Sequence, residues 1–511
     1  MNGAFGLAIA SVIVLTFVLD SMAKPHALLR RSAASPLLHI FSVAWIALLA
    51  LAVTSRPIIS AFVAFALVGL VVSVSNAKYE SLREPFVFTD LSLFSQLFEH
   101  PRLYLPFLSV GKIAAISVGV LLVIGGFVAE PAVVRGSMWL PLLLSVVLFL
   151  AARLLAARLS LSLDPRIDQA KHGFFAVFVA YLLNGLRSAT VATFQQATAA
   201  SPFATGTPQR RPDVVVIQSE SFFDIRRICD AVDSSGFAQF EQARREAVYY
   251  GELTVPAWGA NTMRTEFAVL SGVPSAALGY AQFYPYAFVR RACVSLARWF
   301  GRAGYATLAI HPYYADFFGR NRVFPLLGFE RFFDIGHFAD AARAGPYVAD
   351  AAVADTIVST LNAQDDKPRF IFAMTMENHG PLHLEQVLPG ESSSRHTLGE
   401  DASWRDLTAY LRHIENADAM IGRLLDYLRA SNRETVVCFY GDHVPALSHV
   451  FHKLDVNPQR SDYFIWRNYG AVAPECRDLA AEELGVALLR VVQDDGNRTQ
   501  EPCVSEKATY K

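Results

Sequence analysis

The sequence has few cysteines and almost no net charge. Its 511 residues include five cysteines, too few and too scattered for a disulfide scaffold or a zinc site: Cys229, Cys293, Cys438, Cys476 and Cys503. A single late bridge between Cys476 and Cys503 would require an oxidising compartment. The formal net charge is −1, so the balance of charges gives no reason to expect a nucleic acid as a partner.

Charged residues are also scarce in the first part of the chain, where Ala, Val, Leu, Ile and Phe dominate. Five apolar stretches approach the roughly 20 residues that a helix needs to cross a bilayer. They are residues 4–20, 37–55, 57–75, 108–128 and 138–157. The shorter run 173–186 is either a sixth span or an amphipathic helix that lies in the membrane interface. We therefore expect residues 1–189 to form a polytopic transmembrane domain with five or six spans.

Basic residues predict the orientation of these spans. Lys and Arg gather between the first and second spans, between the third and fourth, and after the fifth, around Lys24, Lys78 and Lys171. The positive-inside rule then places the N-terminus outside and Lys171 inside the cell. A sixth crossing would bring the remaining chain to the outer side of the membrane.

The second part of the chain has the pattern of an α/β domain. Residues 190–212 are small, polar and proline-containing, which is typical of a linker. Within 213–495, four near-continuous apolar runs are typical of strands buried on both faces: 213–219, 305–311, 369–376 and 435–441. Apolar residues at helical spacing from Leu407 to Leu428 predict an amphipathic helix. This alternation predicts a mostly parallel central sheet, followed by a C-terminal tail at 496–511.

Polar residues close or directly follow the four predicted strands. In chain order they are Glu220, then His311, then Glu377, Asn378 and His379, and finally Asp442 and His443. In open α/β sheets, ligands bind beyond the carboxyl ends of the strands. Carboxylate and imidazole groups suit a divalent cation, so Glu220, Asp442 and His443 are candidate metal ligands. Taken singly, Glu220 could instead cap a helix, and Asp442 and His443 could belong to an ordinary turn.

Thr262 is the candidate nucleophile. In the segment 256–272, a glycine-bearing loop ends at Thr262 and a helical pattern follows. A hydroxyl at a helix start feels the positive end of the helix dipole, which favours an alkoxide and attracts phosphate. A metal ion bonded to that oxygen would lower its pKa further. The alternative is that Thr262 only caps the helix.

Five short motifs carry a family resemblance. They are SES at 219–221, GxxTxxxEF at 259–267, HxxxxxFFxRN at 311–321, ENH at 377–379 and YGDH at 440–443. In order and spacing they resemble the lipoteichoic acid synthase-like family, phosphoglycerol transferases with the alkaline phosphatase/sulfatase fold. The segment 78–91 also resembles the part that follows the third span in that family. The Ala- and Arg-rich character is more similar to the proteobacterial branch.

The resemblance implies site residues, a cofactor and partners. A manganese-like ion, with Mg²⁺ as the alternative, would be held by Glu220, Thr262, Asp442 and His443. Thr262 would form a covalent glycerophosphoryl intermediate, and the phosphate or glycerol oxygens would be bound by His311, Arg320 and His379. The donor would be a phospholipid such as phosphatidylglycerol, and the acceptor a glycan or a lipid. The catalytic domain would then lie in the periplasm, anchored in the bacterial inner membrane.

Two departures from the Gram-positive enzymes bear on the head group and the acceptor. Asn261 stands where those enzymes have a lysine, and Phe318 where they have a tryptophan. A phosphoethanolamine transferase with the same threonine and metal is therefore the alternative enzyme. A sulfatase would need a C/S-x-P-x-R motif, which the sequence lacks. An inactive membrane scaffold or sensor is the alternative of another class, but it would not need a charged cluster at the strand ends.

Overall fold

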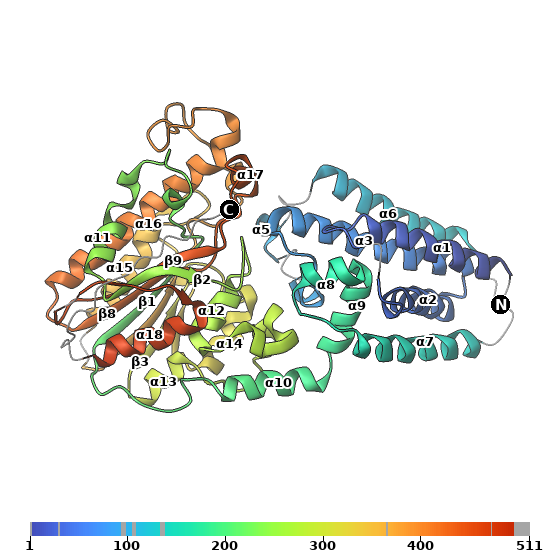
Figure 1. The fold of residues 1–511 in the computed structure, drawn as a ribbon, viewed down its shortest axis with the longest axis horizontal. Helices are drawn as coiled ribbons and strands as arrows, with labels where there is room; N and C mark the ends of the chain where they lie inside the picture. The colour runs from blue at the N-terminus through green and yellow to red at the C-terminus, as the bar shows by residue number, and fades with distance from the viewer. Residues whose placement is uncertain are drawn as a thin grey trace. The chain divides into compact units, whose positions relative to one another are not determined.

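The computed structural model describes residues 3–28, 31–93, 99–104, 109–132, 138–363, 366–471 and 473–494. The expected tail at 496–511 lies outside these residues. So does Cys503, so the proposed bridge to Cys476 stays a prediction. The chain forms two compact units: Met1–Ala192 with Gly279–Phe283, and Thr193–Leu278 with Tyr284–Lys511. Figure 1 shows the helical first unit and the second unit built on a sheet.

Long apolar helices make up most of the N-terminal unit. They are α1 (Gly3–Ser21), α2 (Ala34–Thr54), α3 (Pro57–Leu82), α6 (Val110–Ala129) and α7 (Trp139–Arg158), one for each of the five predicted spans. Four of them, α2, α3, α6 and α7, are long and apolar enough to cross a membrane, whereas Phe5–Ser21 in α1 is a shorter apolar helix. Helix α6 buries none of its residues within the unit. So much exposed apolar surface is unfavourable in water and suits a lipid environment.

Shorter helices follow α7, and one of them occupies part of the segment that we expected to be a linker. They are α8 (Pro165–His172), α9 (Phe174–Gly185) and α10 (Ser188–Ala199). Helices α9 and α10 are apolar enough together to span, but they are bent by 70°, as in a broken span or a re-entrant loop. Helix α10 also occupies the first part of the segment 190–212 that we expected to be a linker, since no proline interrupts it before Pro202.

Short helical turns and one returning segment complete the N-terminal unit. The turns are η1 (Phe88–Leu93) and α5 (Pro101–Tyr104). Residues Gly279–Phe283, from the second half of the sequence, belong to this unit. There the Tyr280 hydroxyl accepts a hydrogen bond from Asn184 Nδ2 at 3.1 Å. The sequence did not predict that this segment would leave the α/β unit.

The C-terminal unit contains a nine-stranded sheet in the order β10-β2-β9-β8-β1-β7-β3-β4, with β11 paired to β2. Its strands are β1 (Asp213–Ser219), β2 (Tyr249–Thr254), β3 (Ala306–Ile310), β4 (Arg331–Phe333), β7 (Arg369–Met374), β8 (Thr435–Gly441), β9 (Arg460–Arg467), β10 (Glu475–Cys476) and β11 (Leu479–Ala480). The four predicted strands are β8, β1, β7 and β3, which lie side by side and parallel. The prediction of a mostly parallel sheet is confirmed. Strand β9, antiparallel to both β8 and β2, is the exception.

Helices cover both faces of this sheet. One face carries α11 (Ala238–Glu246), α15 (Asp350–Leu361) and α16 (Arg405–Ala430), and the other carries α12 (Thr262–Ser271), α13 (Leu296–Arg302) and α18 (Ala481–Gln493) (Figure 1). Two shorter helices are α14 (Arg320–Leu327) and α17 (Ser448–Lys453), and β5 (Arg343–Ala344) pairs with β6 (Tyr347–Val348). The predicted apolar face of α16 is buried from Leu407 to Leu428, where it packs in the main core. That burial explains the helical spacing of its apolar residues.

A buried ionic cluster ties the segment after β7 to α16. His413 Nδ1 lies 3.0 Å from Glu377 Oε1, and His413 Nε2 lies 2.9 Å from Glu385. Glu377 Oε2 accepts the backbone N–H of Asp350 at 2.8 Å. Burial by itself would lower the pKa of His413, but the two carboxylates raise that pKa to about 9. His413 is therefore a cation in the folded protein at neutral pH, and it holds the chain that leads from β7 into His379.

We expect the stability of the C-terminal unit to fall as pH rises from about 6.5 to about 9. An unfolded histidine titrates near 6.5 and folded His413 near 9, so its contribution is complete below the lower value and is lost through the upper one. His413→Gln should lower the free energy of unfolding by on the order of 3 kcal/mol at pH 6 and by much less at pH 9.5. Thermal unfolding of the purified protein across this pH range measures the effect.

The exposed His452 provides a matched control, because His452→Gln removes an imidazole that lies on the surface of the same unit. The plot of its thermal stability against pH should run parallel to that of the wild type. If His413→Gln also gave a parallel curve, the cationic role of His413 would be wrong.

Candidate active site

The three predicted metal ligands meet at the carboxyl edge of the sheet. Ligand atoms of Glu220, Asp442 and His443 all lie within 4.8 Å of one another, and all three residues are buried. Strands β1 and β8 are parallel neighbours in which Ser219 is opposite Gly441. Glu220 and Asp442, the first residues after the two strands, therefore leave the sheet together. A Cβ atom at Gly441 would lie 1.9 Å from the carbonyl oxygen of Phe222, so glycine is required there.

Backbone and hydroxyl groups orient the two carboxylates. Asp442 Oδ1 accepts the backbone N–H groups of Ser221 at 2.7 Å and His443 at 2.9 Å. Glu220 Oε1 accepts the Ser221 hydroxyl at 2.8 Å. The backbone N–H of Glu220 donates to Thr375 Oγ1 at 3.0 Å, which joins this loop to the end of β7. Asp442 thus uses one oxygen to fix the loop.

The remaining ligand atoms fit a divalent cation. Asp442 Oδ2 is buried and has no hydrogen-bond partner among the described residues. His443 Nδ1 donates to the Val444 carbonyl oxygen at 3.1 Å, so its Nε2 is left as a lone-pair donor. That Nε2 lies 3.3 Å from Asp442 Oδ2 and 3.6 Å from Glu220 Oε1. Burial, with the adjacent Asp442, raises the pKa of Glu220 to about 8, and a nearby cation would favour its charged form.

Thr262 stands at the start of α12, and the flanking chain bonds to the loop that carries Asp442 and His443. The backbone N–H of Gly259 donates to Val444 O at 3.0 Å, and Thr265 Oγ1 donates to Asp442 O at 2.7 Å. These two bonds bracket Thr262 and hold the helix start against the loop. Asn261, with φ of 65°, occupies the N-cap position, and Thr262 is the first helical residue. The N-cap position therefore belongs to Asn261 and not to Thr262.

The predicted substrate-binding residues lie at neighbouring strand ends. His311 follows β3, His379 follows β7, and Arg320 begins α14. Arg320 Nη1 lies 3.2 Å from His311 Nε2, so these two residues are in contact. His379 Nδ1 donates to Gly380 O at 2.7 Å, which leaves its Nε2 free to accept. Burial and Arg320 lower the pKa of His379 against the opposite influence of Gly380 and Asp442.

One residue of this site was missed by sequence reasoning. Glu266 forms a paired hydrogen bond with Arg320, from Nε to Oε1 at 3.1 Å and from Nη2 to Oε2 at 2.8 Å. The resemblance implied that Arg320 binds phosphate or glycerol oxygens, but two of its three nitrogens already donate to Glu266. The signal was present in GxxTxxxEF, because Glu266 lies one helical turn after Thr262.

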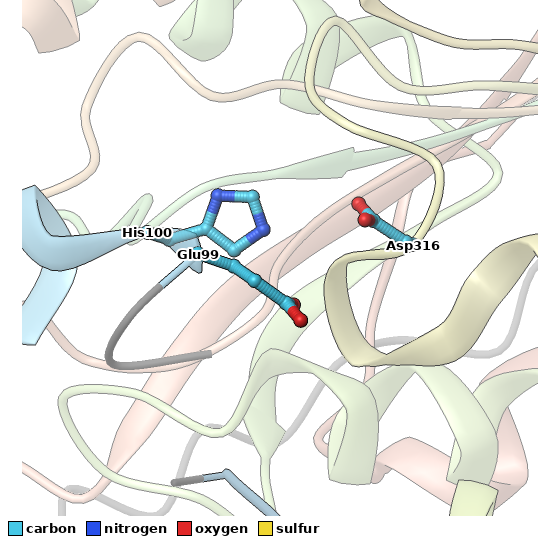
Figure 2. A group of neighbouring side chains, drawn as sticks. All are labelled: Glu99, His100 and Asp316. Carbon is cyan, nitrogen blue, oxygen red and sulfur yellow. The ribbon is translucent and has the colours of Figure 1, made fainter. Parts of the chain in front are cut away.

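Three other side chains with metal-binding chemistry are drawn in Figure 2: Glu99, His100 and Asp316. Glu99 and His100 belong to the N-terminal unit, whereas Asp316 belongs to the C-terminal unit. Because they come from different units, we do not assign them to a common metal site.

A family model described as Sulfatase matches residues 212–485, more than half of the chain and nearly all of the sheet domain. The chain belongs to the sulfatase family. The predicted membership of the alkaline phosphatase/sulfatase superfamily is thereby confirmed. The match includes every candidate site residue from Glu220 to His443.

Relatives of this sulfatase-family chain include a capsular polysaccharide biosynthesis protein, RkpI, from Rhizobium meliloti (strain 1021). It is 30% identical over 441 residues, which cover 81% of this chain and 78% of that protein. Among solved structures, the integral membrane lipooligosaccharide phosphoethanolamine transferase A (EptA) from Neisseria meningitidis has a TM-score of 0.57. It is 14% identical, and the match covers 96% of this chain and 95% of that one. The two chains therefore share a fold that includes the membrane unit.

A second solved structure is the Streptococcus pyogenes phosphoglycerol transferase GacH in complex with sn-glycerol-1-phosphate. It is 21% identical, with a TM-score of 0.46, and the match covers 59% of this chain and 80% of that one.

Removal of one ligand should abolish metal binding. Asp442→Asn removes the negative charge of the unpaired oxygen. Loss of a residue that only hydrogen-bonds to a metal ligand typically lowers metal affinity by about 10- to 100-fold, and we expect a larger loss of Mn²⁺ affinity here. The wild type, stripped with EDTA, should regain thermal stability when Mn²⁺ is added, and the variant should not. Metal content after dialysis gives a second measurement.

Asp426→Asn is the control, because this aspartate lies on the exposed side of α16 with its side chain 73% exposed. It should bind metal like the wild type. Equal metal content in Asp442→Asn and the wild type would rule out this group as the metal centre.

Proposed function

We propose that this protein is a membrane-bound transferase that moves a phosphoglycerol group from a lipid, phosphatidylglycerol, to a glycan or lipid acceptor outside the cytoplasm. The observation that carries the proposal is the position of Thr262. It begins α12, and bonds on both sides of it hold that helix start against the loop of Asp442 and His443. A hydroxyl at a helix N-terminus beside a metal-binding group is suited to attack phosphorus.

The transfer proceeds in two half-reactions. Thr262 Oγ attacks the lipid phosphorus, the bond to the diacylglycerol oxygen breaks, and diacylglycerol leaves with a proton. The acceptor hydroxyl then attacks the same phosphorus, loses its proton, and Thr262 Oγ departs with one. When bound by Glu220, Asp442 and His443, a divalent cation (Mn²⁺ first, Mg²⁺ as the alternative) supplies the positive charge that lowers the pKa of the Thr262 hydroxyl.

Other groups of this chain stabilise the transferring phosphate. A helix N-terminus attracts anions, so the start of α12 at Thr262 favours a phosphate there, and Arg320 adds a buried cation. His311 and His379 complete the binding site for phosphate or glycerol oxygens. Sulfate ester hydrolysis is disfavoured despite the family name, because the chain has no C/S-x-P-x-R motif.

The second candidate is transfer of phosphoethanolamine by the same threonine. The observation that favours it is the shared fold with the phosphoethanolamine transferase from Neisseria meningitidis, which extends over 96% of this chain. A polysaccharide acceptor is supported by the name of the Rhizobium relative, a capsular polysaccharide biosynthesis protein. Both candidates require the catalytic unit to face the periplasm.

Mass spectrometry of Thr262 tests the mechanism and the head group together. After incubation with mixed phospholipids and without acceptor, we expect the peptide that contains Thr262 to gain about 154 Da, the mass of a glycerophosphoryl group. A gain of about 123 Da would instead identify phosphoethanolamine. Thr262→Ala should lose the adduct and all turnover while the protein stays folded, because Thr262 is the first helical residue and alanine has a high helix propensity.

Thr265→Ser is the matched control, since it keeps a hydroxyl that can donate to Asp442 O one turn further along α12. It should still form the adduct. Substantial turnover by Thr262→Ala would contradict a covalent mechanism, and an absence of any adduct or turnover in the wild type would favour the inactive scaffold.

Reporter fusions test the location. A reporter that is active only outside the cytoplasm should be active when it is fused after Lys511 and inactive when it is fused near Lys171, because basic residues favour the cytoplasmic side. Activity at both sites would mean that α9 and α10 do not cross the membrane. Inactivity at Lys511 would contradict a lipid donor in the outer leaflet.

A further inference from the structure

Glu266 has no free capacity for catalysis of its own. It is fully buried on α12 and accepts four hydrogen bonds, two from Arg320, one from the Tyr286 hydroxyl and one from Gln218 Nε2 at 3.2 Å. A carboxylate offers about four lone-pair sites, so all of them are occupied. Gln218 is fixed in turn, because its Oε1 accepts the Tyr440 hydroxyl at 2.5 Å. Glu266 is therefore an anchor and cannot serve as a base or a metal ligand.

This anchor sets the direction of Arg320. The guanidinium is 1% exposed, and its Nε and Nη2 atoms are committed to Glu266. Because the guanidinium is planar, two fixed nitrogens also fix the third. The third nitrogen, Nη1, is held 3.2 Å from His311 Nε2.

The contact with Arg320 decides which nitrogen of His311 carries the proton. Arginine has N–H donors and no acceptor, so His311 Nε2 must accept and the proton must be on Nδ1. Burial and the adjacent Arg320 lower the pKa of His311 well below its usual value, so the ring is neutral. Its Nδ1 is buried and has no hydrogen-bond partner among the residues that the structure describes. His311 thus carries an N–H donor with no acceptor from the protein.

We propose that Glu266 is a positioning residue which, through Arg320, keeps His311 in the Nδ1–H tautomer, so that this N–H donates to an oxygen of the transferred phospho-alcohol group. The proposal rests on the proposed function for the identity of that group. Without the Glu266 charge, Arg320 is free to rotate, and His311 Nε2 is no longer obliged to accept. The imidazole could then adopt the other tautomer and present an acceptor where the substrate oxygen needs a donor.

The test compares Glu266→Gln with the wild type in the whole chain, in detergent, loaded with the diamagnetic Mg²⁺. Long-range proton–nitrogen spectra of histidine-labelled protein, with His311→Gln to identify the signal, report the tautomer without any substrate. We expect a pure Nδ1–H form in the wild type and a mixture in the variant. With phosphatidylglycerol as the donor, kcat/KM should fall by about 10- to 100-fold. Tyr286→Phe, which removes one hydrogen bond to Glu266, should show both changes to a smaller extent. This variant replaces Glu266→Gln in the test if Glu266→Gln does not fold.

Asp213→Asn is the matched control for a merely structural ion pair. Asp213 is also buried and binds Arg433 through two bonds, 2.6 and 3.0 Å long, but it lies at the amino end of β1, far along the strand from Glu220. The Asp213→Asn substitution should lower thermal stability and leave the His311 tautomer and kcat/KM unchanged.

The outcomes separate the two proposals. An Nε2–H signal in the wild type, or an unchanged tautomer in both Glu266→Gln and Tyr286→Phe, would overturn the role of Glu266. An equal loss of kcat/KM in Asp213→Asn would overturn it as well. If the wild type showed the expected tautomer but no activity on phosphatidylglycerol, the choice of donor would be wrong and the positioning role would stand on the spectra.

Discussion

The parallel pairing of β1 with β8 is the constraint on which the site depends. It places Ser219 opposite Gly441, so the next residues, Glu220 and Asp442, leave the sheet side by side. Burial raises the pKa of the Glu220 carboxyl group, and repulsion from the neighbouring Asp442 carboxylate raises it further. A bound cation would offset the free-energy cost of burying these two negative charges. His443 Nε2 and Asp442 Oδ2 are the other candidate ligand atoms for such a cation.

Helix α12 connects this group of carboxylates to Arg320 and His311. Thr265 ties the helix to the Asp442 loop, and Thr262 stands at its positive end. One turn further along, Glu266 holds Arg320, which contacts His311. A single short helix therefore sets both the position of Thr262 and the direction of Arg320. Because every side chain of α12 after Thr262 is buried, the helix has little freedom to shift.

The structure of the N-terminal unit depends more directly on local sequence. Its long helices are set by local composition, since twenty consecutive apolar residues have few stable alternatives to a membrane-spanning helix. Helices α9 and α10 are the exception, because a 70° bend divides them. The sequence left a span and an interfacial helix equally open for the run 173–186, and it predicted neither α10 nor the bend.

The sequence by itself determined the features that depend on local pattern: the apolar helices, the four central strands, the face of α16 that is buried, and which residues follow each strand. It also identified Glu220, Asp442 and His443 as a group, since the ends of parallel strands share one edge. Only the tertiary structure decided which strands are neighbours, that α12 begins at Thr262 with Asn261 at the N-cap position, and that Arg320 is paired with Glu266, 54 residues away. The physical reason is that a buried charge takes whichever partner the fold brings within hydrogen-bonding distance. That distance is set by packing between segments far apart in the chain, and no short stretch of sequence encodes it.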